Sequence, residues 1–89
     1  MDFEWDRRKA RANLDKHGVS FQEATEVFAD GQSSVVADPD HSVDEDRFVI
    51  FGRTIGSRFL VVAFTERDAR IRIISARTMT RSERIAYEP

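Results

Sequence analysis

The chain has 89 residues and no cysteine, with 40% hydrophobic and 34% charged residues. This size and balance fit one folded domain spanning residues 1–89, and the absence of cysteine excludes disulfide and thiolate chemistry. The longest apolar run, residues 59–64, is far shorter than the roughly 20 residues of a membrane helix. Residues 1–9 lack the apolar stretch of a secretory signal. We therefore expect a cytoplasmic protein without membrane contact.

The formal net charge of −2 hides an asymmetry between the two halves of the chain. Residues 1–46 carry 5 basic and 12 acidic residues, whereas residues 47–89 carry 9 arginines and 4 acidic residues. Only Lys9 and Lys16 are lysines. Arginine presents a planar fork of donors that suits phosphate and stacks on bases, so this half favours recognition of a polyanion. The simpler alternative, arginines that only solvate sheet edges, remains open at this point.

The first 30 residues predict a strand and two helices. Polar and apolar residues alternate over residues 2–5, as in a short edge strand. Asp6 suits a helix N-cap, residues 7–16 are good helix formers, and Gly18 suits the end of that helix. Ser20 and Glu23 have the spacing of a capping box, which opens a second helix running to about residue 29.

The remainder predicts strands and a final helix. Residues 33–37 favour a strand, and residues 38–46 an acidic loop. Residues 47–55, 58–65 and 70–77 are strong strand signals, joined by a two-residue turn at Gly56-Ser57 and a turn at residues 66–69. A capping box from Thr80 to Glu83 opens a short helix through Tyr87. The order predicts an α+β fold: two N-terminal helices packed on an antiparallel sheet, with a short C-terminal helix.

These turns fix a register and therefore two sheet faces. Ile55 would pair with Arg58, and Thr65 with Arg70. The core face would then carry Val49, Phe51, Leu60, Val62, Phe64, Ile71 and Ile73. The other face would place Arg70 and Arg72 beside small residues as a shallow basic surface, with Arg77 at the strand end. The alternative is a solvent face whose arginine stems lie on apolar neighbours.

The polar side chains of this sequence suit RNA cleavage without a metal or cofactor. The acidic loop lacks calcium-loop spacing, and the two histidines lack zinc spacing. In RNA the neighbouring 2′-hydroxyl attacks the phosphorus, so a protein need only position the chain, move protons and stabilise charge. Arginines suit the charge, His17 or Glu66 the proton, and Tyr87 hydrogen bonding or stacking. His17 could equally cap the carbonyls of its helix, and spacing alone assigns none of these roles.

Several segments match a known family in order and spacing over almost the whole chain. The most specific are residues 16–19 (Lys-His-Gly-Val) and 73–77 (Ile-Ile-Ser-Ala-Arg), supported by residues 3–6 and 65–67. With these segments the chain resembles the BrnT family. The resemblance implies a RelE-like toxin of a type II toxin–antitoxin pair, with ribonuclease activity that blocks translation. It also implies a BrnA-type antitoxin with a ribbon-helix-helix domain, through which alone the complex contacts operator DNA.

Candidate site residues follow from this resemblance, although the family shows no recognisable RelE catalytic set. The candidate catalytic residues lie at motif positions: His17, Arg67, Arg72, Arg77 and Tyr87. The candidate RNA-binding residues are Lys16, Arg53, Arg70 and Arg81. Thr78-Met79 stands where Lys-Ala is more usual, which removes one basic side chain. Two further hypotheses remain: a non-catalytic RNA- or antitoxin-binding module acting in operon autoregulation, and an inactive toxin retained for operon control.

Overall fold

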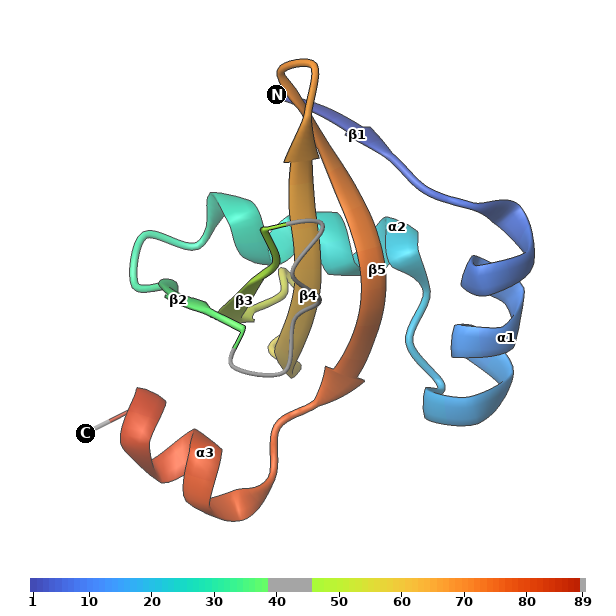
Figure 1. Cartoon of the computed structure of the whole chain (residues 1–89). Helices are drawn as coiled ribbons and strands as arrows, with labels where there is room; N and C mark the ends of the chain where they lie inside the picture. Colours follow the sequence, from blue (N-terminus) through green and yellow to red (C-terminus); the bar gives the residue numbers. More distant parts are fainter. Residues whose placement is uncertain (39–45, 89) are drawn as a thin grey trace.

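The computed structural model describes residues 1–38 and 46–88 (Figure 1). It has five strands in the order β1-β5-β4-β3-β2, together with helical segments that make it an α+β fold as predicted. The prediction of an antiparallel sheet is wrong at one edge, because β1 runs parallel to β5. No described helix is both long and apolar enough to cross a membrane. The elements are β1 (Asp2–Glu4), α1 (Arg7–His17), α2 (Phe21–Ala24), η1 (Thr25–Ala29), β2 (Ser34–Ala37), β3 (Phe48–Arg53), β4 (Phe59–Arg67), β5 (Arg70–Thr78) and α3 (Arg81–Tyr87).

The predicted helix ends are confirmed. The Asp6 carboxylate accepts hydrogen bonds from the backbone of Arg8 and Lys9 at 2.8 and 3.0 Å, which caps the start of α1. Gly18 ends that helix with a φ of 69°, a left-handed conformation that glycine adopts without steric cost. The second predicted helix has the expected extent but is not α-helical throughout. Its first turn is the α-helix α2, and the rest is the more tightly wound 3₁₀ helix η1.

The helices α2 and η1 pass behind the sheet in Figure 1 and bury its apolar side chains. We call this side of the sheet the covered face. Gly52 on β3 lies so close to η1 that an added Cβ would stand 2.8 Å from the Cβ of Val27, so only glycine fits there. The core consists of Val19, Phe21, Ala24, Val27, Ile50, Leu60, Val62, Phe64, Ile73 and Ala76.

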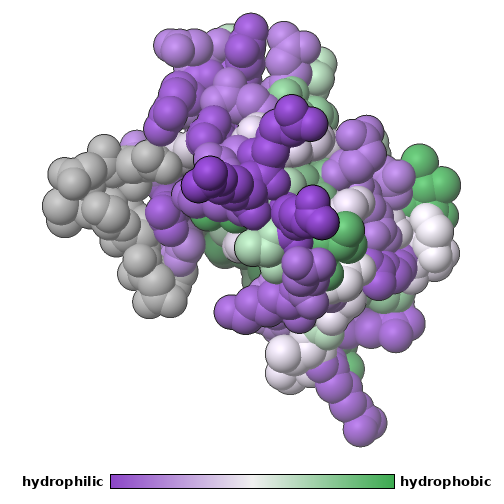
Figure 2. Space-filling model, turned by 90° about the vertical axis from the view of Figure 1, so that its right-hand side faces the viewer, coloured by the Kyte–Doolittle hydropathy of each residue, from purple (hydrophilic) through white to green (hydrophobic). Residues whose placement is uncertain are grey.

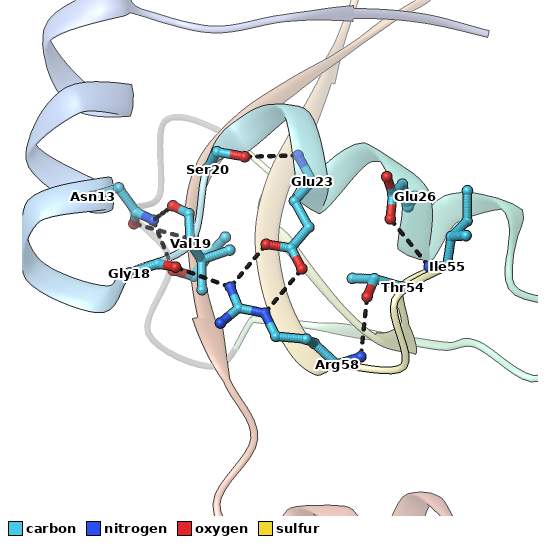
Figure 3. A network of polar contacts seen from close by, with 10 residues as sticks. Asn13, Gly18, Val19, Ser20, Glu23, Glu26, Thr54, Ile55 and Arg58 are labelled. Carbon is cyan, nitrogen blue, oxygen red and sulfur yellow. Dashed lines mark hydrogen bonds and ion pairs between the residues drawn. The ribbon is translucent and has the colours of Figure 1, made fainter.

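Two polar networks fix α1 and the α1–α2 junction to the sheet. The buried amide of Asn13 donates to the carbonyls of Val19 and Ala76 at 3.0 and 2.8 Å and accepts from the Ala76 N–H at 3.0 Å. It thereby occupies the edge of β5 beyond the three residues paired with β1. Arg58 reaches the junction from the turn before β4, donating to both carboxylate oxygens of Glu23 and to the carbonyl of Gly18 (Figure 3).

The predicted register of the first hairpin is wrong by one residue. The connection is not a two-residue Gly56-Ser57 turn, because Thr54 bonds through its backbone to both Ser57 and Arg58. Strand pairing therefore starts with Arg53 opposite Phe59. A one-residue slip exchanges the two faces of a strand. Ile50 accordingly lies in the core, and the predicted core residues on β3, Val49 and Phe51, lie on the other face.

The second hairpin differs from prediction by an even number of residues, so its faces are as expected. Strand β4 continues to Arg67, and the turn is the tight pair Asp68-Ala69, with positive φ values of 52° and 64°. Ile71 and Ile73 pack on the core as predicted. Farther along, Phe64 pairs with Ile73 but Ala63 with Ser75, which leaves Ile74 as an extra residue in β5.

This bulge has a direct consequence for the arginines of β5. Arg72 and Arg77 are five residues apart, and strict alternation would send them to opposite faces of the sheet. The extra residue Ile74 restores the phase, so Arg72, Ser75 and Arg77 all project away from the covered face. We call the side of the sheet opposite the covered face the groove face.

Candidate functional site

The groove face is hollowed across β2 to β5 where the sheet meets α3. One cavity, of about 350 Å³, is lined by Val36, Asp38, Val49, Phe51, Val61, Ala63, Ser75, Arg77 and Glu83. An adjoining cavity, of about 330 Å³, is lined by Gln32, Ser34, Val36, Phe51, Glu83, Ala86 and Tyr87. The two share Val36, Phe51 and Glu83 and so form one continuous hollow, which we call the groove.

The charged centre of the groove is a two-pronged ion pair between β5 and α3. Nη1 and Nη2 of Arg77 contact the two carboxylate oxygens of Glu83 at 2.8 and 3.0 Å. The same carboxylate accepts the backbone N–H of Thr80 at 2.8 Å, and the Thr80 hydroxyl accepts the Glu83 N–H, which completes the predicted capping box. Hydrogen bonding from Arg77 lowers the pKa of Glu83 to about 2, so this carboxylate is ionised at neutral pH.

A second ion-pair group lies at the opposite end of β5. Glu4 on β1 contacts Arg72 at 3.0 Å and Arg70 at 3.6 Å, and its pKa is lowered chiefly by the hydrogen bond from Arg72. Both arginines lie on the groove face, as predicted, but Arg72 pairs across the ladder with Thr65 rather than Ala63. As expected, Arg70 and Arg72 lie together and Arg77 lies apart at the strand end, but each of these two groups holds a carboxylate that the sequence did not indicate.

Of the nine candidate residues from the sequence, Arg77 and Tyr87 line the groove. Lys16 and His17 are exposed in the last turn of α1, outside the groove lining. The remaining candidates lie at strand ends or on α3: Arg53 ends β3, Arg67 ends β4, Arg70 and Arg72 begin β5, and Arg81 begins α3. The structure thus brings two of the nine together and distributes the others around the molecule.

Tyr87 fastens the C-terminal end of α3 to the body of the protein. Its hydroxyl donates to the carboxylate of Asp30, which also accepts the Arg53 N–H at 2.8 Å. Burial, together with the hydrogen bond to Asp30, raises the pKa of Tyr87 to about 12, so the phenol keeps its proton at neutral pH. Its ring meets the edge of Phe59 with centroids 5.9 Å apart, and the Arg84 guanidinium lies 4.0 Å above the same Phe59 ring.

Among the groove residues that were not singled out from the sequence, three are central to the site: Glu83, Phe51 and Ser75. The sequence marked Glu83 only as part of a capping box. Its pairing with Arg77 was not predicted, because ion pairs along a helix join residues three or four positions apart and these two are six apart. Phe51 was assigned to the core by the wrong register of β3. Ser75 is exposed on the groove face and lies within the family-like run at residues 73–77, which was the one available signal for it.

The groove can hold a nucleotide phosphate beside an apolar surface. The two Arg77 N–H groups that grip Glu83 have the spacing that two phosphate oxygens also satisfy. Ser75 adds a hydroxyl, and Val49, Phe51 and Val61 supply an apolar wall. Within residues 1–38 and 46–88, no group of three or more histidine, aspartate or glutamate side chains is placed to hold a metal ion.

Comparisons with known proteins agree with this architecture. The family model described as the ribonuclease toxin BrnT of a type II toxin–antitoxin system matches residues 5–83. The crystal structure of the Brucella abortus ribonuclease toxin BrnT is similar, with a TM-score of 0.67 and 24% identity over 91% of this chain and 99% of that one. No curated protein sequence matches. The chain therefore belongs to the BrnT family of ribonuclease toxins of type II toxin–antitoxin systems.

Proposed function

We propose that the chain is an endoribonuclease toxin that cuts RNA in the groove without a metal ion and so inhibits translation in the cytoplasm. A BrnA-type antitoxin with a ribbon-helix-helix domain neutralises it and carries the contact with operator DNA. The observation that carries the proposal is the Arg77–Glu83 pair, a two-pronged anion grip beside an apolar wall, in a chain of a ribonuclease family. The RelE-like character of the fold is part of the same proposal.

In the first step, the scissile phosphate replaces Glu83 on Arg77. Glu83 is an internal ligand of the guanidinium, and the two N–H groups it occupies suit a pair of non-bridging phosphate oxygens equally well. Arg77 then lies where negative charge develops as the phosphorus becomes five-coordinate, which is where a fixed cation accelerates the reaction most. The ribose and base rest on the apolar wall around Phe51.

In the second step, the released carboxylate takes the proton of the 2′-hydroxyl. Loss of the Arg77 hydrogen bonds returns the pKa of Glu83 towards its ordinary value, which makes it a better base than it is in the ion pair. The 2′-oxygen bonds to phosphorus as the bond to the 5′-oxygen breaks. Tyr87, once released from Asp30, protonates the leaving 5′-oxygen. The products are a 2′,3′-cyclic phosphate and a 5′-hydroxyl.

The remaining candidate residues contribute binding rather than chemistry in this proposal. His17, Arg67 and Arg72 do not line the groove, so we assign them, with Lys16, Arg53, Arg70 and Arg81, to contacts with RNA outside it. Arginines that contact phosphates raise affinity without reading sequence.

The test is cleavage of RNA by the purified chain, freed of antitoxin, in buffer containing EDTA. We expect fragments with 2′,3′-cyclic phosphate or 3′-phosphate ends and with 5′-hydroxyl ends. Glu83→Gln, which keeps an acceptor for the Thr80 N–H but is a far weaker base, should cut at least about 100-fold more slowly. Circular dichroism of both proteins serves as the folding control. Intact RNA after incubation with folded wild-type protein would overturn the proposal.

A second candidate is a non-catalytic RNA-binding module. It is favoured by one observation: the best-placed arginines, Arg72 and Arg77, already hold carboxylates. This candidate predicts RNA binding that weakens steeply with salt, with no fragments at any protein concentration. Titration of fluorescent RNA at two salt concentrations, run beside the cleavage assay, separates the two functions.

A further inference from the structure

Strand β2 forms an outer edge of the sheet with which no other described strand pairs. Among residues 1–38 and 46–88 this outer strand pairs only with β3, and all four of its residues are exposed, with Val35 at 52% and Val36 at 47%. Sheet edges are normally protected by proline, lysine, a bulge or a covering segment. Strand β2, with the sequence Ser-Val-Val-Ala, contains neither proline nor lysine, and its register with β3 is regular. Such an edge accepts another strand.

The hydrogen bonds between β2 and β3 show which backbone groups of β2 point away from the sheet and can bond to an added strand. The Asp38 N–H donates to the Arg47 carbonyl at 2.9 Å and continues the β2–β3 ladder. Because antiparallel strands alternate, Val36 turns its backbone groups toward β3 in the same way, and Val35 and Ala37 turn theirs outward. A strand added beside β2 would therefore bond to the N–H and C=O groups of Val35 and Ala37.

This edge is continuous with the groove. Val36 pairs with Val49 across the ladder and projects onto the groove face, where it lines both cavities. Around it the lining is largely apolar, with Phe51, Ala86 and Tyr87 close by. Alternate side chains of an added strand would project over this end of the groove, and one apolar side chain could enter it.

The charge of the segment around β2 indicates what kind of strand would bind to this edge. Among the described residues 30–38, Asp30 and Asp38 are acidic and none is lysine or arginine. At the outer edge of β2 this segment favours a peptide carrying lysine or arginine over a polyanion. The side of the molecule with α1, shown in Figure 2, is less suited to docking, because hydrophobic residues appear there as separate patches among hydrophilic ones.

We propose that the antitoxin adds an extended segment to the edge of β2. An apolar side chain of that segment enters the groove beside Val36 and Phe51, and a lysine or arginine lies near Asp38. The segment then excludes RNA from Arg77, which gives neutralisation by direct occlusion. This inference rests on the proposed function for its inhibitory consequence, whereas the docking itself rests on the edge and on the antitoxin partner of the family.

The first experiment removes the outward N–H of β2. Val35→Pro deletes that donor and leaves the bonds to β3 in place, and Val35→Thr is the matched control that keeps a β-branched residue and the N–H. The probe is the purified antitoxin of the same toxin–antitoxin pair, titrated by calorimetry. We expect Val35→Pro to bind at least about tenfold more weakly and Val35→Thr within about twofold of wild type. Equal affinity of Val35→Pro and wild type would overturn the proposal.

The same variant separates this inference from the proposed function. Val35→Pro should still cut RNA at the wild-type rate and should resist inhibition by the antitoxin. If wild-type protein binds antitoxin through β2 but cuts no RNA, the nuclease proposal fails and the docking site stands. If cleavage is normal and Val35→Pro is inhibited as well as wild type, the docking site fails alone.

A second measurement does not depend on proline being tolerated. Because the chain has no cysteine, Val36→Cys and Ala69→Cys each introduce a single thiol, the second at the exposed β4–β5 turn. We expect the antitoxin to slow maleimide labelling of Val36→Cys at least about tenfold and to leave Ala69→Cys unchanged. Protection of Val36→Cys by RNA but not by antitoxin would assign this edge to the substrate and overturn the proposal.

Discussion

The two faces of the sheet are built from the same strands but carry different chemistry. On the covered face, side chains such as Leu60 and Val62 are fully buried against α2 and η1. On the groove face, the alternate residues include Ser75 and Arg77, and α3 is held by the Arg77–Glu83 ion pair and by contacts of Tyr87 and Arg84, with no buried residue of its own. The comparison indicates that stability and the proposed activity belong to alternate residues of the same strands, so substitutions should separate them.

The largest expected effect lies on the groove face, where the two arginine groups of β5 can be compared directly. If the proposed mechanism holds, Arg77→Ala should slow RNA cleavage by about 100- to 1,000-fold, because it removes the cation that faces the phosphate in that mechanism. Arg72→Ala, which removes a partner of Glu4, should slow it by no more than about threefold. Rates of cleavage of a fluorescent RNA measure both. Equal losses in the two variants would show that the groups act together and would remove the distinction between them.

On the covered side, Asn13→Ala should destabilise the protein by about 2–3 kcal/mol. The substitution leaves the N–H of Ala76 without its partner at a buried edge and deletes two further hydrogen bonds. Asp15→Ala, an exposed change on the same helix, is the control and should stay within about 0.5 kcal/mol. Urea unfolding followed by circular dichroism gives both values.

A smaller loss is expected from Gly52→Ala, also on the covered face. Its Cβ would meet the Cβ of Val27 at 2.8 Å, so η1 must move, at a cost of about 1–3 kcal/mol. Gly31→Ala is the matched control, since nothing lies within 4 Å of its added Cβ. If both variants unfold at the same urea concentration, the close packing of η1 on β3 is not present in solution.

The smallest effect concerns pH and the Arg77–Glu83 pair. The pKa of Glu83 is lowered in the folded protein to about 2, so the pair stabilises the fold above the ordinary glutamate pKa of 4.5 and loses this contribution as the pH falls towards 2. Wild type should therefore be more stable than Glu83→Gln at pH 6, by about 1 kcal/mol or less because Arg77 is partly exposed. Thermal melts should show this gap shrinking between pH 5 and pH 2, and a gap that widens would contradict the pairing.

Much of the fold was predictable because the signals are local. Alternation marked the strands, and Asp6, Gly18, Ser20 and Thr80 marked the helix ends. The register of β3 was not predictable, because one extra residue in the Thr54–Arg58 turn exchanges the two faces of the strand. The parallel pairing of β1 with β5 was missed for a related reason: nothing near either strand in the sequence encodes it.

Less of the candidate site could be predicted. The arginine-rich half drew attention to β5, but the sequence does not show which carboxylate each guanidinium meets. Glu4 lies far from Arg72 in the sequence, and Glu83 reaches Arg77 only because α3 turns back over the end of the sheet. The bulge at Ile74, which places Arg72 and Arg77 on one face, likewise has no clear sequence signature.

The pairing of the first strand with the last has a consequence for synthesis of the protein. A ribosome releases the segment containing Asp2 long before it adds Arg70, its neighbour in the sheet. The β1 edge of the sheet therefore cannot form until β5 has been synthesised, and the ion pair between Glu4 and Arg72 forms only then. The groove, which needs both Arg77 and Glu83, therefore forms only after the codons of these two residues have been translated.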